Sequence, residues 1–413
     1  SAWRRRSAPL FIFAVVAGCS AIVSGPETRP ASQPASASVQ SPNVRPLLGE
    51  AQYEALAREL REKYAGPSDR WPQPTLDPGV LHRELGLIPT VEHPADNPFS
   101  PAKQELGRTL FFDPRLSGSG SIACASCHEP DLGWADGRTV AFGHGRAAGK
   151  RNTPTIMNSA FNAHQFWDGR ANSLEEQAKR PVTTEVEMNA DPAVVAARLA
   201  EAPEYRRMFR EAFGDERIDM DRVAMAIATF ERTLVGGRSR FDAFLKGNRD
   251  ALNDAAVRGL HLFRTDARCL NCHNGPTFTD HGFHDLGLSY YGRPFEDLGR
   301  YHVTKKPQDV GKFKTPSLRN VGRTAPYMHN GLFELDGVLS MYNAGMPTLR
   351  RKEGQENDPL FPTKSALLKP LRLNERDLSD LKEFLLSLNE PTTRVRPPKL
   401  PVAATAPSTR NSE

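Results

Sequence analysis

The chain has 413 residues, of which 38 % are hydrophobic and 8 % aromatic, with 34 prolines and 31 glycines. This composition indicates a loop-rich globular protein that is long enough for two domains. The formal charge of +5 is small, and no basic stripe interleaved with aromatic residues is present, so nucleic-acid binding is excluded from the expected functions.

The N-terminus has the pattern of an export signal. Arg4, Arg5 and Arg6 precede the apolar run "APLFIFAVVAG", which is too short to span a bilayer. We therefore predict a signal peptide over residues 1–18. The run ends in "VAGC", which resembles a bacterial lipobox and would make Cys19 the lipidated first residue of a lipoprotein anchored by acyl chains. An ordinary cleaved signal with an incidental cysteine is the alternative.

Residues 19–47 are rich in Ser, Pro and Ala and cannot bury enough apolar area to fold, which predicts a disordered tether. An N-terminal extension is expected over residues 48–97. It begins with a predicted helix at 48–66, where Tyr53, Leu56 and Leu60 have helical spacing. The Pro-rich residues 67–100 are expected to run irregularly over a domain.

The other four cysteines form two identical patterns, "CASCH" and "CLNCH". In each, a histidine directly follows the second cysteine, which is the spacing that attaches haem c through two thioether bonds and supplies an imidazole ligand to the iron. Two disulfides, or one zinc site built from both pairs, are the alternatives. Because all four cysteines are used in the same way, the sequence predicts two covalent haems at Cys124, Cys127 and His128, and at Cys269, Cys272 and His273.

The two haem motifs divide the rest of the chain. We predict one haem domain at residues 98–245 and a second at 246–388, because an apolar helical segment precedes each motif. Helical periodicity recurs in "DPAVVAARLAEAPEYRRMFREAF", "DRVAMAIATFERTLVG" and "LNERDLSDLKEFLLSL". The expected fold is therefore mostly α, with two cytochrome-c-like domains and long irregular loops. The tail, residues 389–413, is expected to be disordered.

The stretch "ELDGVLSMYNAG" offers two side chains that could bind a haem iron. Leu335, Val338, Leu339 and Tyr342 follow i, i+3, i+4, i+7 spacing, so Tyr342 belongs to the apolar face of a helix. Met341 is turned away from this face by about 100°. Tyr342 is therefore the expected ligand, and a buried core tyrosine is the alternative interpretation.

Several long stretches then resemble, in order, the bacterial di-haem cytochrome c peroxidases and their relative MauG. They include "ELGRTLFFDPRLSGSGSIACASCH", "QFWDGRANSLEEQAKRPV", "EVEMN" and "GKFKTPSLRNVGRTAPYMHNG", and the resemblance covers residues 100–388. It implies an exported enzyme in which hydrogen peroxide reacts at the first haem and a periplasmic or surface partner protein supplies electrons. It also implies one calcium ion.

The resemblance assigns roles to individual residues. His128 and His273 match the proximal ligands of the peroxide-reacting haem and of the second haem. Trp167 matches a tryptophan between the haems, although a core anchor is the alternative reading of a tryptophan. Glu187 matches a carboxylate that moves a proton between the peroxide oxygens, with Glu185 expected to be a surface charge. Pro181 matches a residue packed over the open iron face.

Three further residues match the calcium site: the Asn152 side chain and the main-chain carbonyls of Thr324 and Pro326. No acidic cluster marks this site in the sequence. His144 lies 16 residues after His128, as does a histidine that caps the resting first haem in many of these peroxidases. MauG lacks that ligand. The two possibilities for His144, a resting ligand or a loop residue away from iron, both stay open.

In the family alignment, Tyr342 stands where peroxidases carry a methionine ligand and MauG a tyrosine. A phenolate stabilises oxidised iron, whereas methionine raises the potential. The resemblance therefore implies MauG-like chemistry through a bis-Fe(IV) state, and more finely the di-haem enzyme of methanobactin operons, which converts a partner tryptophan to kynurenine. The alternatives are a peroxidase that takes electrons from a small cytochrome or copper protein, and a non-catalytic di-haem electron carrier.

Overall fold

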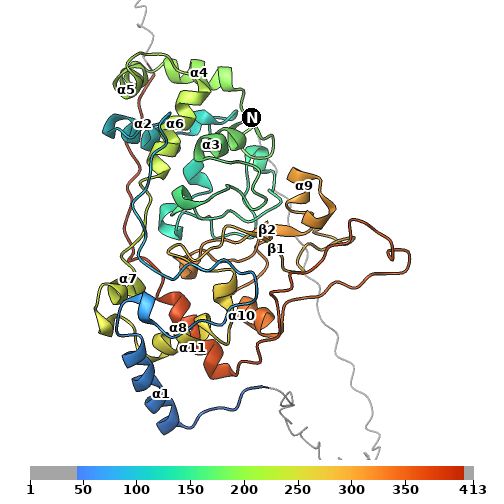
Figure 1. Cartoon of the computed structure of the whole chain (residues 1–413). Coiled ribbons are helices and arrows are strands. Elements are labelled where there is room, and N and C mark those ends of the chain that lie inside the picture. The colour runs from blue at the N-terminus through green and yellow to red at the C-terminus, as the bar shows by residue number, and fades with distance from the viewer. Residues whose placement is uncertain (1–43, 404–413) are drawn as a thin grey trace, which may run out of the picture. The chain divides into compact units, whose positions relative to one another are not determined.

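The computed structural model describes residues 44–403 (Figure 1). Eleven α-helices and one two-stranded sheet lie in this part of the chain, connected by long irregular segments. The expectation of a mostly helical fold is confirmed. The helices are α1 Glu50–Lys63, α2 Pro101–Phe111, α3 Leu174–Thr183, α4 Pro192–Ala200, α5 Pro203–Phe213, α6 Met220–Glu231, α7 Arg240–Leu245, α8 Asp254–Arg264, α9 Tyr301–Thr304, α10 Leu335–Asn343 and α11 Glu375–Leu386. The strands β1 Phe283–Asp285 and β2 Lys312–Lys314 pair antiparallel.

Side-chain caps set the start of the main helices. The Ser100 hydroxyl accepts a hydrogen bond from the backbone N–H of Lys103 at the start of α2, and Asp219 does the same for α6. At the start of α11, Asn374 and Asp377 cap each other's backbone N–H groups. Each cap satisfies N–H groups that have no partner inside the helix and contributes about 1 kcal/mol.

The buried apolar side chains form two separate clusters. The first is built by α2 to α6 and includes Leu106, Phe111, Tyr205, Phe209 and Phe230. The second is built by α1, α7, α8, α10 and α11 and includes Leu60, Phe241, Phe263, Phe278 and Phe384. In Figure 1 the two groups of helices lie on opposite sides of the sheet β1–β2. Helix α7 packs in the second cluster, although it belongs to the proposed first haem domain, which ends at residue 245.

The N-terminal extension packs against the second cluster. Helix α1 lies against α8, and Tyr53 and Leu60 are buried as the helical spacing predicted. Residues 67–100 form only a short 3-10 turn, yet they bury Trp71 and Leu85 in the cluster. The guanidinium of Arg264, which is 1 % exposed, donates to Glu84 and to the carbonyl of Pro72. These contacts hold the irregular segment to α8.

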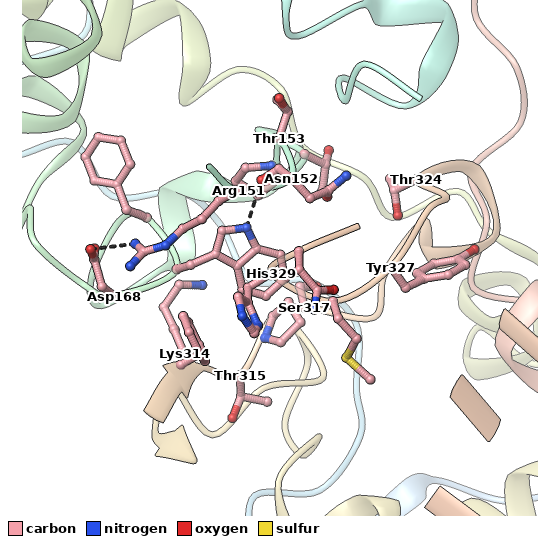
Figure 2. A pocket seen from close by; sticks show the side chains of 18 of the residues that line it. Arg151, Asn152, Thr153, Asp168, Lys314, Thr315, Ser317, Thr324, Tyr327 and His329 are labelled. Atoms are coloured by element: carbon pink, nitrogen blue, oxygen red, sulfur yellow. Dashed lines mark hydrogen bonds and ion pairs between the residues drawn. The ribbon is translucent and has the colours of Figure 1, made fainter. Parts of the chain in front are cut away.

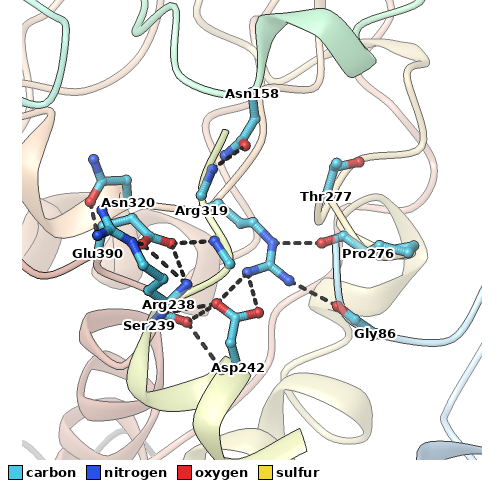
Figure 3. A network of polar contacts seen from close by, with 12 residues as sticks. Gly86, Asn158, Arg238, Ser239, Asp242, Pro276, Thr277, Arg319, Asn320 and Glu390 are labelled. Carbon is cyan, nitrogen blue, oxygen red and sulfur yellow. Dashed lines mark hydrogen bonds and ion pairs between the residues drawn. The ribbon is translucent and has the colours of Figure 1, made fainter. Parts of the chain in front are cut away.

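A buried ion pair ties several distant segments together (Figure 3). Arg319 donates to both carboxylate oxygens of Asp242 in α7, and each side chain is only 1 % exposed. The same guanidinium donates to the carbonyls of Pro276 and Gly86. One side chain therefore joins the extension, α7 and the segment that follows the second haem motif.

The C-terminal segment differs from the expected disordered tail. Residues 390–403 form no helix or strand, but the buried Glu390 accepts hydrogen bonds from the backbone N–H groups of Gly237 and Arg238. Farther on, Arg108 and Arg115 donate to the carbonyls of Arg396 and Pro401. The prediction of disorder is wrong for residues 390–403, because backbone carbonyls anchor this segment without any periodic apolar pattern that the sequence could show.

The predicted signal peptide, Cys19 and all but the last four residues of the predicted tether lie outside the described residues. Within residues 44–403, none of the helices combines the length and the apolar character that crossing a membrane would need.

Candidate functional site: two haem motifs on one cavity

Both haem motifs open onto one cavity with a volume of about 1370 Å³. This volume exceeds the roughly 300–1,000 Å³ that is usual for a pocket holding one small ligand. Its lining includes all four motif cysteines and both motif histidines, and most of the other residues that the resemblance singles out: Trp167, Pro181, Glu187, Tyr342, Asn152, Thr324 and Pro326. Residues that lie far apart in the sequence, from Cys124 to Tyr342, therefore line one cavity.

The two motifs have the same local structure. Cys124–Ser126 and Cys269–Asn271 each form a 3-10 turn, and the four thiols are free. The Nδ1 atom of His128 lies 3.1 Å from the carbonyl of Trp134, and that of His273 lies 3.0 Å from the carbonyl of Phe278. A carbonyl partner makes Nδ1 the protonated nitrogen and leaves Nε2 with a free lone pair, as in most metal-binding histidines. Free thiols, oriented imidazoles and a large cavity together fit two haem c groups.

Helix α10 presents Tyr342 and not Met341 to the cavity. Tyr342 lines the cavity together with Cys269, Cys272 and His273, whereas Met341 and Met346 do not. The Tyr342 hydroxyl makes no hydrogen bond with any of the described residues. Burial raises the pKa of this phenol, and the nearby Cys272 and Cys269 sulfurs add to the effect. The hydroxyl is therefore a free oxygen donor that faces the second haem site.

Two long segments beside the haem motifs are copies of each other. Residues 152–171 and 314–333 match at a constant difference of 162 in residue number: "NTPTIMN" corresponds to "KTPSLRN", and "QFWDG" to "YMHNG". Three pairs of equivalent residues have positive φ: Asn158 and Asn320, Phe166 and Met328, Gly169 and Gly331. Equivalent turns are closed by the bridges Gln165–Ala171 and Tyr327–Phe333. We call these two segments the inter-haem repeat; its sequence signal is T-P-x-x-x-N, which our sequence analysis missed.

The helices that follow the two copies show how the haem sites differ. Helices α3 and α10 come directly after the copies, and the eighth residue is Pro181 in α3 and Tyr342 in α10. Both residues line the cavity. Proline has no side-chain atom that can bind a metal, whereas tyrosine has a hydroxyl. The chain can therefore supply a sixth ligand from this helical position only at the second haem.

Glu187 lines the cavity and lies close enough to Cys127 of the first haem motif for its charge to help raise the pKa of that thiol. Burial raises the pKa of the Glu187 carboxyl, and Arg170 opposes that shift. Glu185 is exposed, as expected for a surface charge. His144 is not among the residues that line the cavity, although its backbone N–H donates to the carbonyl of Glu187 at 2.7 Å. Its Nδ1 is buried and has no partner among the described residues.

Trp167 stands where the two copies of the inter-haem repeat meet. Its indole Nε1–H donates to the carbonyl of Asn152 at 2.9 Å. The backbone N–H of Lys314 donates to the Trp167 carbonyl at 2.7 Å, and the equivalent N–H of Asn152 donates to the His329 carbonyl at 2.8 Å. Each copy thus binds the other through equivalent backbone groups. Beside them, Arg151 pairs with Asp168, as Figure 2 shows, and also with Asp297.

The three residues expected to bind calcium come from both copies of the inter-haem repeat: Asn152 from the first, and Thr324 and Pro326 from the second. Asn152 is buried, and Thr324 and Pro326 line the same cavity. Among the described residues, no hydrogen bond ends on the carbonyl oxygens of Thr324 and Pro326 or on the Asn152 side-chain oxygen. Free, uncharged oxygen donors of this kind fit a calcium ion.

Two cavity residues escaped the sequence analysis. His329, the equivalent of Trp167, is 4 % exposed and stacks on Phe313 with ring centroids 3.6 Å apart. Its Nε2 has no partner among the described residues, and burial lowers its pKa to about 4. Lys314, the equivalent of Asn152, is 9 % exposed. The sequence signal that could have identified them is the inter-haem repeat, because it makes them equivalent to Trp167 and Asn152.

The fold and the paired motifs define a di-haem c-type protein, and comparisons with known proteins agree. The family model described as di-haem cytochrome c peroxidase matches residues 101–250. The methylamine utilization protein MauG of Methylorubrum extorquens is 42 % identical over 316 residues, 76 % of this chain and 85 % of that protein. The cytochrome-c peroxidase IdrP1 of a Pseudomonas species is 40 % identical over 342 residues, 75 % of this chain and 87 % of that protein.

A solved structure is also similar. It is titled as a MauG-like protein associated with microbial copper homeostasis, and it matches with a TM-score of 0.66 and 34 % identity over 74 % of this chain and 94 % of that one. The chain belongs to the family of di-haem cytochrome c peroxidases and MauG. It is a haem-dependent oxidoreductase of the class that acts on peroxide, with two haem c groups.

Proposed function

We propose that the chain uses hydrogen peroxide at the first haem to oxidise aromatic side chains, tryptophan above all, of a partner protein. The observation that carries this proposal is the pair Pro181 and Tyr342, which occupy equivalent positions in α3 and α10. At the first haem, Pro181 offers no metal ligand, so one face of the iron would stay open to peroxide. At the second haem, the hydroxyl of Tyr342 is available as an oxygen ligand.

The residues around the first haem bind and activate peroxide in this proposal. The haem iron, when bound, supplies the centre that takes up the two oxidising equivalents of peroxide. The carboxylate of Glu187 accepts the proton of the inner peroxide oxygen and returns it to the outer oxygen, which leaves as water. Pro181 covers the iron face and leaves room for a small molecule. Each peroxide consumes two electrons and two protons and yields two waters, and the partner side chain supplies the electrons.

The residues around the second haem favour storage of oxidising equivalents. A deprotonated Tyr342 is anionic and stabilises the more oxidised states of the iron to which it binds. Trp167 lies at the junction of the two copies and carries charge between the haems. A small donor protein, which delivers electrons one at a time at a high potential, would be better served by a methionine ligand.

We propose that the partner belongs to copper handling, because the similar solved structure is titled as a MauG-like protein associated with microbial copper homeostasis. The finer proposal is that a partner tryptophan becomes kynurenine. Two peroxides remove four electrons and four protons while two waters supply two oxygen atoms, which gives N-formylkynurenine, and hydrolysis then releases the formyl group as formate. The test is to incubate the ferric protein with two or more equivalents of peroxide per partner and the secreted proteins encoded beside it, followed by peptide mass spectrometry. A kynurenine-containing peptide that requires both enzyme and peroxide is the expected result; peroxide consumption without any modified partner would contradict it.

A peroxidase that reduces peroxide with electrons from a small cytochrome or copper protein is the second candidate, favoured by the 40 % identity to a cytochrome-c peroxidase. Steady-state assays with reduced cytochrome c separate the two candidates. Rapid turnover with this donor, and no partner oxidation, would favour the peroxidase. A non-catalytic electron carrier is less suited to the site, because it has no use for the buried carboxyl of Glu187.

For His144 we propose a position away from iron in the resting protein, since it does not line the cavity. Ferric electron paramagnetic resonance should then show one high-spin and one low-spin haem. If the wild type instead shows two low-spin haems and His144→Ala shows only one, His144 is a ligand of the first haem.

We also propose that the protein is exported to the periplasm or cell surface and anchored there by lipid at Cys19. Membrane fractionation tests this, because Cys19→Ala should release the protein from the membrane fraction.

A further inference from the structure

Lys314 is a buried cation without a counter-ion among the described residues. It ends strand β2 and is 9 % exposed, and its side chain lines the cavity between the two haem motifs (Figure 2). Its Nζ makes no hydrogen bond or ion pair with a described residue. Burial lowers the pKa of this amine to about 8. Holding an unpaired ammonium in such a place costs several kcal/mol, so a bound anion is expected beside it.

The cation that directly precedes the first copy of the inter-haem repeat is fully paired. Arg151 donates to Asp168 at 2.6 Å and to Asp297 at 2.6 Å. The repeat places Phe313 at the position of Arg151 and the neutral Asn330 at the position of Asp168. The second copy therefore has no acid at the position of Asp168, which neutralises Arg151. Lys314 lies one position after the equivalent of Arg151, and no equivalent carboxylate is present to pair with it.

Lys314 is equivalent to Asn152, and this equivalence indicates which kind of group Lys314 contacts. Asn152 belongs to the proposed calcium site, so a cation would lie at this position of the first copy in the form of a bound ion. The second copy brings a cation in the form of the Lys314 ammonium. A haem c carries two propionate carboxylates, and the cavity next to Lys314 connects both haem motifs.

We propose that Lys314 is the counter-ion of a haem propionate at the junction of the two haem sites. Its backbone N–H donates to the Trp167 carbonyl at 2.7 Å, so the same residue would link a bound propionate to the backbone of Trp167. The buried and unpartnered Nε2 of His329 offers a second polar group in this cavity. This inference concerns haem binding and does not depend on the substrate of the enzyme.

The test is a spectroelectrochemical titration of the holoprotein that resolves the two haem midpoint potentials. Loss of the cation in Lys314→Gln should favour ferric iron and lower one midpoint, with a change of tenfold or more in the ferric-to-ferrous ratio at fixed potential, which is 59 mV for one electron. Lys314→Arg keeps the charge and should restore the wild-type midpoint. Lys312→Gln is the matched control, because it removes an equal charge from the same strand at a side chain paired with Asp309.

Titration in phosphate and in an amine buffer distinguishes a propionate from a free anion. A propionate gives the same difference between Lys314→Gln and wild type in both buffers; a difference that appears only in phosphate would overturn the proposal. So would midpoints in Lys314→Gln that equal those of Lys312→Gln, or an equal shift in Lys314→Arg. If Lys314→Gln does not mature with both haems, Lys314→Arg decides: wild-type haem content and midpoints support the proposal, and shifted midpoints overturn it.

Discussion

The indole Nε1–H of Trp167 donates a hydrogen bond to the backbone carbonyl of Asn152 at 2.9 Å. Both residues belong to the first copy of the inter-haem repeat, and both are bound by backbone groups of the second copy. This bond fixes the plane of the indole ring in the cavity between the haem motifs. It also links the residue proposed to carry charge with a residue proposed to bind calcium.

We expect Trp167→Phe to separate the two haems functionally. The variant keeps an aromatic ring but loses the indole and its hydrogen bond, so peroxide should still react with the first haem while oxidation of the second haem and of the partner slows. Stopped-flow spectroscopy of both haem bands measures the effect. Trp71→Phe is the control, because it removes a similar indole-to-carbonyl bond, to Gly66 at 2.9 Å, outside the cavity. Equal behaviour of the two variants would contradict the bridging role.

Glu187→Gln should keep both haems and slow the reaction with peroxide by roughly 10²–10⁴-fold, as expected for a positioned acid–base group. The active form is the carboxylate, and burial raises its pKa. The wild-type rate should therefore fall as the pH drops through that raised pKa, and the variant should lack this dependence. Stopped-flow rates across the pH range measure both effects. Glu185→Gln, at an exposed site, should behave as wild type.

Tyr342→Met should raise the midpoint potential of the second haem and make it reducible by mild donors, because a neutral thioether replaces an anionic oxygen. Partner oxidation should be lost, while turnover with a small electron donor survives. Met341→Leu, on a helix face that does not line the cavity, should change neither property. The opposite pattern in a spectroelectrochemical titration would show that α10 presents the other side chain to iron.

The protein should contain one calcium ion that Asn152→Ala removes. Elemental analysis after gel filtration measures the content. Calcium at about 100 times its Kd should stabilise the wild type by about 2.7 kcal/mol and leave the variant unchanged. Magnesium should not substitute, because it demands a more regular shell of ligands. A calcium-free protein whose stability does not respond to the ion would refute the site.

Breaking the buried pair of Arg319 and Asp242 should be costly. Arg319→Leu leaves the Asp242 carboxylate buried without its partner, and we expect the free energy of unfolding to fall by about 3–5 kcal/mol. Lys382→Ala breaks an exposed pair with Asp336 and should change it by less than about 1 kcal/mol. Denaturant titration followed by circular dichroism checks both. A small effect of Arg319→Leu would mean that the network in Figure 3 adds little stability.

The haem-attaching residues and the candidate iron ligand Tyr342 could be predicted from local patterns, whereas the roles of Trp167, Glu187 and the calcium residues came only from the family resemblance. The CxxCH spacing defines the haem attachment because it is chemical and local, and the helical spacing in residues 335–342 predicted the face on which Tyr342 lies. The structure agrees that this face lines the cavity and that Met341 does not. The helical fold followed from apolar periodicity, which a single sequence shows directly.

Tertiary structure alone decided the rest. The order of 390–403 depends on carbonyl contacts that leave no pattern in the sequence, and α7 packs with the second cluster although it follows the first along the chain. Lys314 and His329 are ordinary polar residues in the sequence. They become notable only because folding brings two copies of one segment together, buries a cation without an acid and leaves a ring nitrogen without a partner, since burial and pairing depend on neighbours far away in the chain.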